Sequence, residues 1–473
     1  MDGFADNLGS VWFWVSLAWA VHIAVLSVWI VLQKREPVAT LSWVLGLALL
    51  PVLGFIVYHF LGPQQIKRQR LRRIRSRAAL ADDRRRISER PENHHLGRLS
   101  HLVSASTGYS PSSCTELELL MGGEEAFESL LEHVQRARRH IHLEYYIFAA
   151  DHTGTALRDV LVERARAGVR VRLLVDAVGS AGLGRRFLAP LVEAGGEVAW
   201  FHPLRLSRFW RPRWNFRTHR KIVVIDGRLG FTGGINITDE QDSRRSSAAY
   251  ADIHMRLEGD VVRWLQLAFL EDWHYASGVA LSDETMWPDL PDGPTPVQVV
   301  PSGPDSPWEP IHRLQVEAIH GADRRLWLAT PYFVPGEAAV MALSSAAMRG
   351  VDVRLLVPRR PDSRLVGAAA RSYYDGLLAA GVRIFEYQPR MMHAKALLAD
   401  NALCIVGSAN FDHRSFRLNF ELSVMFSGGE ACRELEKMLR SLLAESREVL
   451  APRRTTRTAS VKEAFARLLS PLL

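Results

Sequence analysis

The chain has 473 residues, of which 48% are hydrophobic, 9% aromatic and 23% charged, a composition typical of a folded protein. Its net charge is +8, and the twelve Lys/Arg and four acidic residues between positions 62 and 100 account for all of it. A nucleic-acid enzyme carries its basic residues around its active site, so the formally neutral remainder argues against a nuclease and against a nucleic-acid partner. The length allows two or three packed domains.

Two uncharged apolar runs open the chain, at residues 11–32 and 38–61. Each is long enough to cross a bilayer, which needs roughly 20 apolar residues. The first run alone also fits a signal peptide, but the N-terminus lacks a basic region and a second run follows at once. The basic segment after the second run favours the cytoplasm for the rest of the chain. We therefore predict a two-helix transmembrane hairpin in residues 1–62.

Residues 63–110 form a basic linker that is arginine-rich and weakly periodic. One interpretation is a solvated helix beside the membrane whose charge enforces the topology. Another adds attraction to anionic lipid headgroups, at about 1 kcal/mol for each basic residue near the surface. The two interpretations are compatible, and we favour topology as the main role.

The three cysteines show no metal-ligand spacing, which predicts neither a metal site nor a structural disulfide.

From residue 111 onward, helical and strand patterns alternate, which is typical of an α/β fold. Residues 111–290 form the first half and residues 291–450 the second. The two halves repeat each other, because residues 168–175 read G-V-R-V-R-L-L-V and residues 350–357 read G-V-D-V-R-L-L-V. We therefore predict two similar α/β halves packed together.

Two further segments have alternative interpretations. Residues 204–214 are basic and aromatic, and either contact lipid headgroups or pack as a loop. Residues 451–473 predict a C-terminal amphipathic helix whose apolar stripe consists of Val461, Ala464, Phe465, Leu468 and Leu469. For this stripe we favour docking on the α/β halves over contact with the membrane.

One motif occurs twice, at a constant spacing of 174 residues. It reads H-x-K-x4-D-x6-G-[GS]-x-N, from His219 to Asn236 and again from His393 to Asn410. Side chains two apart on a strand share a face, so each histidine and its lysine point the same way. The Asp-Gly and Asp-Asn pairs that follow predict hairpins that return each asparagine to its histidine and lysine.

Together the two copies supply two imidazoles, two ammonium groups and two carboxamides, from His219, Lys221, Asn236, His393, Lys395 and Asn410. This set suits a phosphodiester. The lysines neutralise phosphoryl oxygens, the amides donate to them, one imidazole attacks phosphorus and the other protonates the leaving oxygen. Asp226 and Asp400 complete the candidate catalytic set. Because aspartate is common at turns, we favour a hairpin-shaping role for both over proton transfer.

The duplicated motif resembles the phospholipase D superfamily, the HKD enzymes. Its contexts T-G-G-I-N-I-T-D-E and G-S-A-N-F-D-H-R-S-F-R-L-N-F-E resemble those of bacterial cardiolipin synthases. The resemblance implies a transfer without metal or cofactor, with His219 as nucleophile and His393 as acid and base. Ser408 would join the asparagines at the phosphate. A nucleophilic imidazole needs a partner at its other nitrogen, and the resemblance supports Asp252 and Glu421 as these orienting carboxylates.

The implied activity converts two phosphatidylglycerol molecules into cardiolipin and glycerol through a phosphohistidine, at the bacterial inner membrane with anionic lipids as partners. The catalytic part would face the cytoplasm. The same intermediate serves a phospholipase D-type hydrolase or a head-group exchange enzyme, since only the acceptor differs. An HKD nuclease and a non-catalytic membrane scaffold are the remaining alternatives. The neutral halves argue against the first, and the intact His, Lys and Asp positions argue against the second.

Overall fold

The computed structural model describes residues 2–32, 37–49, 64–88, 97–203, 216–281, 283–453 and 455–470. The chain divides into two compact units. The first consists of Met1–Arg68 with Leu206–Asn215, and the second of Gln69–Arg205 with Phe216–Leu473.

The first unit contains two apolar helices, α1 (Asp2–Val31) and α2 (Pro37–Leu49). Residues Trp12–Val31 of α1 have a mean hydropathy of 2.0, and this is the one described helix long and apolar enough to cross a membrane. Helix α2 is the described beginning of the second predicted span and packs on α1 through Ile30 and Leu47. The rest of that span, and the basic and aromatic residues 204–214, lie outside the described residues.

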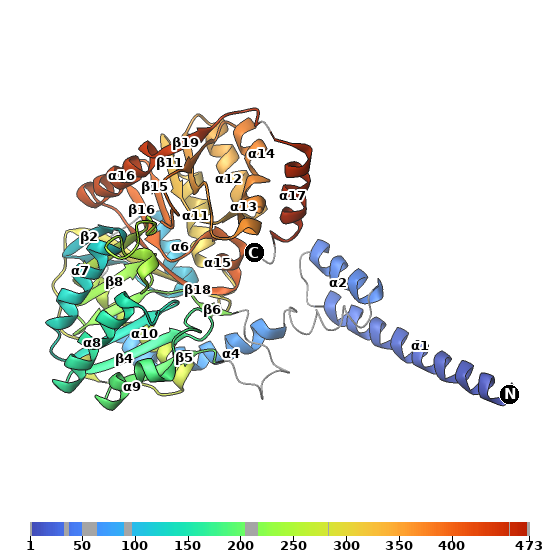
Figure 1. Ribbon diagram of the computed structural model, residues 1–473, viewed down its shortest axis with the longest axis horizontal. Coiled ribbons are helices and arrows are strands. Elements are labelled where there is room, and N and C mark those ends of the chain that lie inside the picture. The colour runs from blue at the N-terminus through green and yellow to red at the C-terminus, as the bar shows by residue number, and fades with distance from the viewer. Residues whose placement is uncertain are drawn as a thin grey trace. The chain divides into compact units, whose positions relative to one another are not determined.

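The second unit is built on two large β-sheets with helices packed against them (Figure 1). In the first half, the described strands form a sheet in the order β2-β9-β8-β7-β3-β4-β5. These strands are β2 (Glu116–Met121), β3 (His140–Tyr145), β4 (Arg170–Asp176), β5 (Glu197–Phe201), β7 (Ile222–Ile225), β8 (Leu229–Gly233) and β9 (Ile253–Glu258). The helices of this half are α7 (Gly122–Gln135), α8 (His152–Arg166), α9 (Arg185–Glu193) and α10 (Val261–Ser277).

The second sheet has the order β1-β10-β18-β16-β15-β11-β13-β14-β19. Its strands are β1 (Ser112–Cys114), β10 (Thr295–Ser302), β11 (Arg325–Ala329), β13 (Asp352–Pro358), β14 (Arg383–Tyr387), β15 (Ala396–Ala399), β16 (Leu403–Gly407), β18 (Asn419–Phe426) and β19 (Ser446–Val449), with β6 (Arg217–Thr218) beside β18 and a separate pair of β12 (Phe333–Val334) and β17 (Phe411–Asp412). The helices are α11 (Pro310–His320), α12 (Glu337–Met348), α13 (Arg364–Arg371), α14 (Tyr374–Ala379), α15 (His413–Arg417), α16 (Gly429–Ala444) and α17 (Arg457–Leu468).

The two sheets share one strand arrangement. In the first, β3 lies between parallel β4 and antiparallel β7, and in the second, β11 lies between parallel β13 and antiparallel β15. The hairpins β7–β8 and β15–β16 then follow in both. Strands β7 and β15 are buried along their whole length, as expected for continuous apolar runs between two layers. The α/β class is confirmed, and the repeated strand order agrees with two similar halves.

Two short contacts join the halves at the start of each motif. Strand β6 pairs in parallel with β18, and Ala251 forms an isolated bridge with Met392. The backbone N–H of His219 donates to the carbonyl of Phe420 at 2.8 Å. The backbone N–H of His393 donates to the carbonyl of Ala251 at 2.7 Å. The opposite half therefore holds the backbone of each histidine.

The basic linker differs from its expected solvated state. It forms α4 (Gln64–Ala79), α5 (Ala81–Ser88) and α6 (Arg98–Thr107), and from Gln69 onward it belongs to the second unit. Arg73 on α4 is only 1% exposed, because it forms ion pairs with carboxylates of the α/β part. For this arginine the solvated interpretation is wrong. The part of α4 that carries Arg73 is therefore an integral element of the second unit.

The C-terminal helix α17 packs against α13, but with a different face from the predicted one. Its buried residues are Glu463 and Ala466, and Glu463 pairs with Arg453 at 2.8 Å. The predicted apolar stripe faces outward, with Phe465 67% exposed and Leu468 74% exposed. Docking of the stripe was therefore the wrong expectation, because a buried ion pair fixes the opposite face.

The motif aspartates lie at the hairpin turns. Asp226 accepts hydrogen bonds from the backbone N–H groups of residues 138–140 at 2.7–2.9 Å, and Asp400 from those of residues 323–325 at 2.8–3.1 Å. Both have a left-handed backbone, with φ of 54° and 53°. A strand rises about 3.3 Å per residue, so Asp226 lies roughly 20 Å along the chain from His219. These contacts support the hairpin-shaping role, which we propose for both aspartates in place of a catalytic one.

We expect Asp226→Asn to destabilise the protein while leaving its chemistry intact. Asparagine tolerates the left-handed backbone but loses the charge and one acceptor, at a cost of about 1–3 kcal/mol. Thermal unfolding followed by circular dichroism measures this loss, and Asp159→Asn, at an exposed carboxylate on α8, is the control. A kcat reduced more than tenfold in a folded Asp226→Asn enzyme would restore a catalytic role.

Candidate active site

The two His-x-Lys segments lie immediately before β7 and β15. Because β7 begins at Ile222 and β15 at Ala396, Lys221 and Lys395 are the last residues before the buried strands. Asn236 and Asn410 follow the returning strands β8 and β16. The registers pair Ile222 with Thr232 and Ala396 with Val406, so each hairpin returns the chain alongside its own His-x-Lys segment.

Each histidine pairs with a carboxylate from the opposite half. The Nδ1 atom of His219 lies 3.0 Å from Oε2 of Glu421, and Nδ1 of His393 lies 2.6 Å from Oδ2 of Asp252. Both carboxylates are fully buried. With Nδ1 of each ring engaged by a carboxylate, Nε2 is the atom left for the substrate. The site therefore contains two carboxylate-oriented imidazoles, and neither half can assemble one alone.

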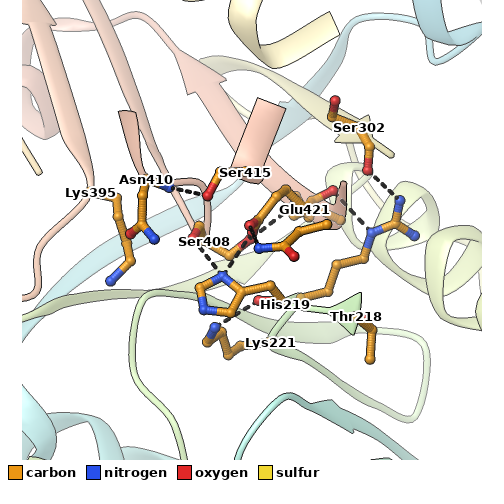
Figure 2. A network of polar contacts seen from close by, with 12 residues as sticks. Thr218, His219, Lys221, Ser302, Lys395, Ser408, Asn410, Ser415 and Glu421 are labelled. Carbon is orange, nitrogen blue, oxygen red and sulfur yellow. Dashed lines mark hydrogen bonds and ion pairs between the residues drawn. The ribbon is translucent and has the colours of Figure 1, made fainter. Parts of the chain in front are cut away.

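The lysines are buried and held by backbone oxygens. Lys221 Nζ donates to the carbonyl of His219 at 2.7 Å, and Lys395 Nζ donates to the carbonyl of His393. Lys395 Nζ also lies 3.8 Å from Asp252. Figure 2 shows Lys395 reaching from the second half toward His219 and Lys221 of the first. Two ammonium groups from different halves thus share one site.

Burial controls the protonation of these groups. It lowers the pKa of Lys221 to about 7 and that of Lys395 to about 8. It also lowers the pKa of His393 to about 4, and lowers the pKa of His219 against the opposing effect of Glu421. A neutral imidazole can act as a nucleophile without first losing a proton, and the partly charged ammonium groups beside it attract an anion.

The carboxylates remain ionised despite their burial. Burial by itself raises the pKa of Asp252, but Lys395 and His393 outweigh it and lower that pKa. For Glu421, His219 and Lys221 likewise outweigh burial and lower the pKa. Each anion therefore stabilises the imidazolium that forms during a proton transfer.

The predicted phosphate ligands have different environments. Asn236 accepts from the backbone N–H of Ile147 through Oδ1 at 3.2 Å, which leaves its amide N–H groups as donors. Asn410 has a buried Oδ1 without a hydrogen-bond partner. Ser408 differs from expectation, because its hydroxyl donates to Glu421 and accepts from the backbone N–H of Leu422. Its side chain supports the carboxylate, and we propose this role for it in place of the predicted phosphate ligand.

Two tyrosines that sequence patterns did not single out lie beside the histidines. The ring of Tyr146 meets that of His219 edge-on with centroids 4.9 Å apart, and Lys221 Nζ lies 5.7 Å from the Tyr146 centroid. The ring of Tyr250 lies 5.7 Å from that of His393. Neither tyrosine belongs to the repeated motif, so the spacing contained no signal for them. Among the described residues, no cluster of three or more His, Cys, Asp or Glu side chains is arranged to hold a metal ion.

A family model described as "Cardiolipin synthase, PLD-like domain" matches residues 130–272 and 316–443, and another described as "Phospholipase_D-nuclease N-terminal" matches residues 23–63. The chain is 39% identical over 462 residues to a cardiolipin synthase of Geobacillus sp. (strain WCH70), covering 93% of this chain and 90% of that relative. It is 39% identical over 460 residues to cardiolipin synthase 2 of Bacillus anthracis, covering 94% and 88%. The solved phosphatidylserine synthase of Haemophilus influenzae Rd KW20 has a similar fold, with a TM-score of 0.60 at 12% identity over 80% of this chain and all of that one.

We expect Glu421→Gln and Asp252→Asn each to lower kcat by about 100-fold with little change in KM. Each variant keeps the size of the side chain but loses the charge that stabilises the imidazolium. Turnover of a chromogenic phosphodiester measures the effect, and Glu430→Gln, at an exposed position on α16, is the control. Wild-type kcat in both site variants would show that the carboxylates only pack the interior.

We also expect KM for an anionic phosphodiester to rise with pH. The ammonium charges are present below the pKa values of about 7 and about 8 and are lost as the pH rises through them. A phosphodiester keeps its single negative charge over this range, so the change belongs to the protein. Initial rates between pH 6 and 9 measure it, and a KM independent of pH would contradict it.

Proposed function

The chain belongs to the cardiolipin synthase family of phospholipase D-like proteins, and on this basis we propose that it converts two phosphatidylglycerol molecules into cardiolipin and glycerol. The observation that carries the proposal is the pair of buried imidazoles, each oriented by a carboxylate of the opposite half. Two such groups on one phosphodiester provide one nucleophile and one proton donor, which a transfer with a covalent intermediate requires.

In the first step, Nε2 of His219 attacks the phosphorus of a phosphatidylglycerol. The N–P bond forms as the P–O bond to the head-group glycerol breaks, and that oxygen takes the proton from Nε2 of His393. The bound anion favours the protonated form of His393, whose pKa burial otherwise holds at about 4. Glu421 accepts from Nδ1 of His219 throughout, so it stabilises the positive charge that develops on this ring.

In the second step, a hydroxyl of another phosphatidylglycerol attacks the same phosphorus. Its proton passes to Nε2 of His393, the P–N bond breaks, and His219 returns to its neutral form. Lys221 and Lys395 hold the phosphoryl oxygens in both steps, and Asn236 and Asn410 donate to them. Since the buried ammonium groups are fixed before the substrate binds, little reorganisation accompanies the development of charge.

The membrane part supports a lipid substrate. Helix α1 is long and apolar enough to cross a bilayer, and basic residues follow the second apolar run. We propose a multi-pass protein of the bacterial inner membrane with its catalytic part in the cytoplasm and anionic lipids as its partners. The positive-inside rule supports this orientation.

Purified full-length protein in detergent, with phosphatidylglycerol as the sole lipid, provides the test. We expect cardiolipin and glycerol in equal amounts, and a loss of at least about 1,000-fold in His219→Ala and His393→Ala because each removes a group that acts in bond breaking. Mass spectrometry of the lipids and an enzymatic glycerol assay measure both products.

His320→Ala, at an exposed histidine near the end of α11, serves as the control for this experiment. A phosphatidyl donor with a nitrophenol leaving group separates the two histidines, because such a group leaves without a proton. His393→Ala should then release one equivalent and retain the phosphatidyl group, whereas His219→Ala should release none. Phosphatidic acid as the only lipid product would make water the acceptor and overturn the synthase assignment.

A further inference from the structure

The first His-x-Lys segment contains a buried arginine that the second lacks. Arg220, between His219 and Lys221, is 1% exposed. Its Nε donates to the carbonyl of Glu421 at 3.0 Å, its Nη2 to the carbonyl of Ser302 at 3.2 Å, and its Nη1 pairs with Asp272. The equivalent residue in the second segment is Ala394. The guanidinium thus fixes the backbone of the residue that orients His219.

Asp272 is shared with an arginine of the basic linker. One oxygen of Asp272 pairs with Arg220 and the other with Arg73 on α4. Arg73 also pairs with Glu271 at 3.0 Å and approaches Asp305 at 3.7 Å. The carboxylates of Glu271 and Asp272 are wholly buried. The linker therefore reaches the catalytic segment through one carboxylate.

An aromatic ring makes a second connection between the same two arginines. The guanidinium carbons of Arg73 and Arg220 lie 5.9 and 5.8 Å from the centroid of Phe420. The carbonyl of Phe420 accepts from the backbone N–H of His219, and the next residue is Glu421. Movement of Arg73 would therefore disturb the strand that holds both the histidine and its carboxylate.

The charges of this cluster are balanced only with the linker in place. Burial opposes ionisation of Glu271, but Arg73, Arg84 and Arg77 outweigh it and lower its pKa to about 2. Burial also opposes the charge of Arg73, yet Asp272, Glu271 and Asp305 raise its pKa. Removing one partner from a buried ion pair leaves an uncompensated charge, which costs far more than an exposed pair contributes.

We propose that Arg73 and Arg220 are positioning residues for the phosphatidyl transfer, and that the linker helix α4 sets the His219–Glu421 pair through Asp272 and Phe420. This inference rests on the proposed function. The linker would then do more than set the orientation of the membrane hairpin through its positive charge. A protein that began after α4 would lack Arg73, so Asp272 would keep only Arg220 and Glu271 only Arg84 as ion-pair partners.

The test compares Arg73→Met with Arg75→Met in the full-length protein in detergent. Both positions are on α4, but Arg75 is exposed. We expect Arg73→Met to lower kcat by about 10- to 100-fold with KM within about twofold, as for other groups that orient a reacting side chain. The excess negative charge should also raise the pKa of His219, so the acidic limb of the kcat/KM profile should move to higher pH. Arg75→Met should show neither effect.

Arg73→Lys provides a second variant if Arg73→Met does not fold. Lysine keeps the charge but lacks the planar fork that contacts several carboxylates at once, so kcat should still fall with KM unchanged. Wild-type kcat in the folded Arg73 variants, with an unmoved pH profile, would overturn the proposal. The nitrophenol burst reports attack by His219 alone, so the comparison stands even if the wild-type protein makes no cardiolipin.

Discussion

The structure depends on pairing the buried carboxylates of the site with imidazoles of the opposite half. Desolvation makes an isolated buried carboxylate or ammonium group very unfavourable, so each needs a partner at hydrogen-bond distance. The partner of His219 is Glu421 and the partner of His393 is Asp252, so each pair joins a histidine of one half to a carboxylate of the other. The short β6–β18 ladder and the Ala251–Met392 bridge fix the backbones at the same two places. Packing of the halves and assembly of the site are therefore one event.

The same burial prepares the site for an anion. In water both lysines would be fully charged and strongly hydrated, and a phosphodiester would have to displace that water. Here burial holds their pKa values at about 7 and about 8, while backbone oxygens fix their positions. The negative charge of an arriving phosphate raises the pKa of both lysines, so binding of the anion and protonation of the lysines favour each other.

The sequence predicts the parts of the site that follow from local geometry. One hairpin positions the His-x-Lys before an apolar strand and the asparagine after the return strand. Their spacing alone therefore predicts that they lie near one another. The environment of Arg73 does not follow from local spacing, because its partners Glu271 and Asp272 lie about two hundred residues further along the chain. An arginine-rich helix has the same pattern whether its arginines face water or buried carboxylates. The outward face of α17 was mispredicted for the same reason, since an apolar stripe does not reveal the ion pair of Glu463 on the other side.

A duplicated site must also be asymmetric, because one histidine has to attack while the other transfers a proton. The two copies differ at the residues that support the rings. His219 has Glu421, which receives the Ser408 hydroxyl and whose carbonyl binds Arg220. His393 has the shorter Asp252, which packs so closely against Gly234 that a side chain at that position would collide with it. The Nδ1 atom of His393 also lies 2.8 Å from Lys395 Nζ. A ring held on several sides suits in-line attack, whereas a ring close to an ammonium group releases its proton more readily. The substitutions that break the symmetry of the repeat therefore favour His219 as the nucleophile and His393 as the acid.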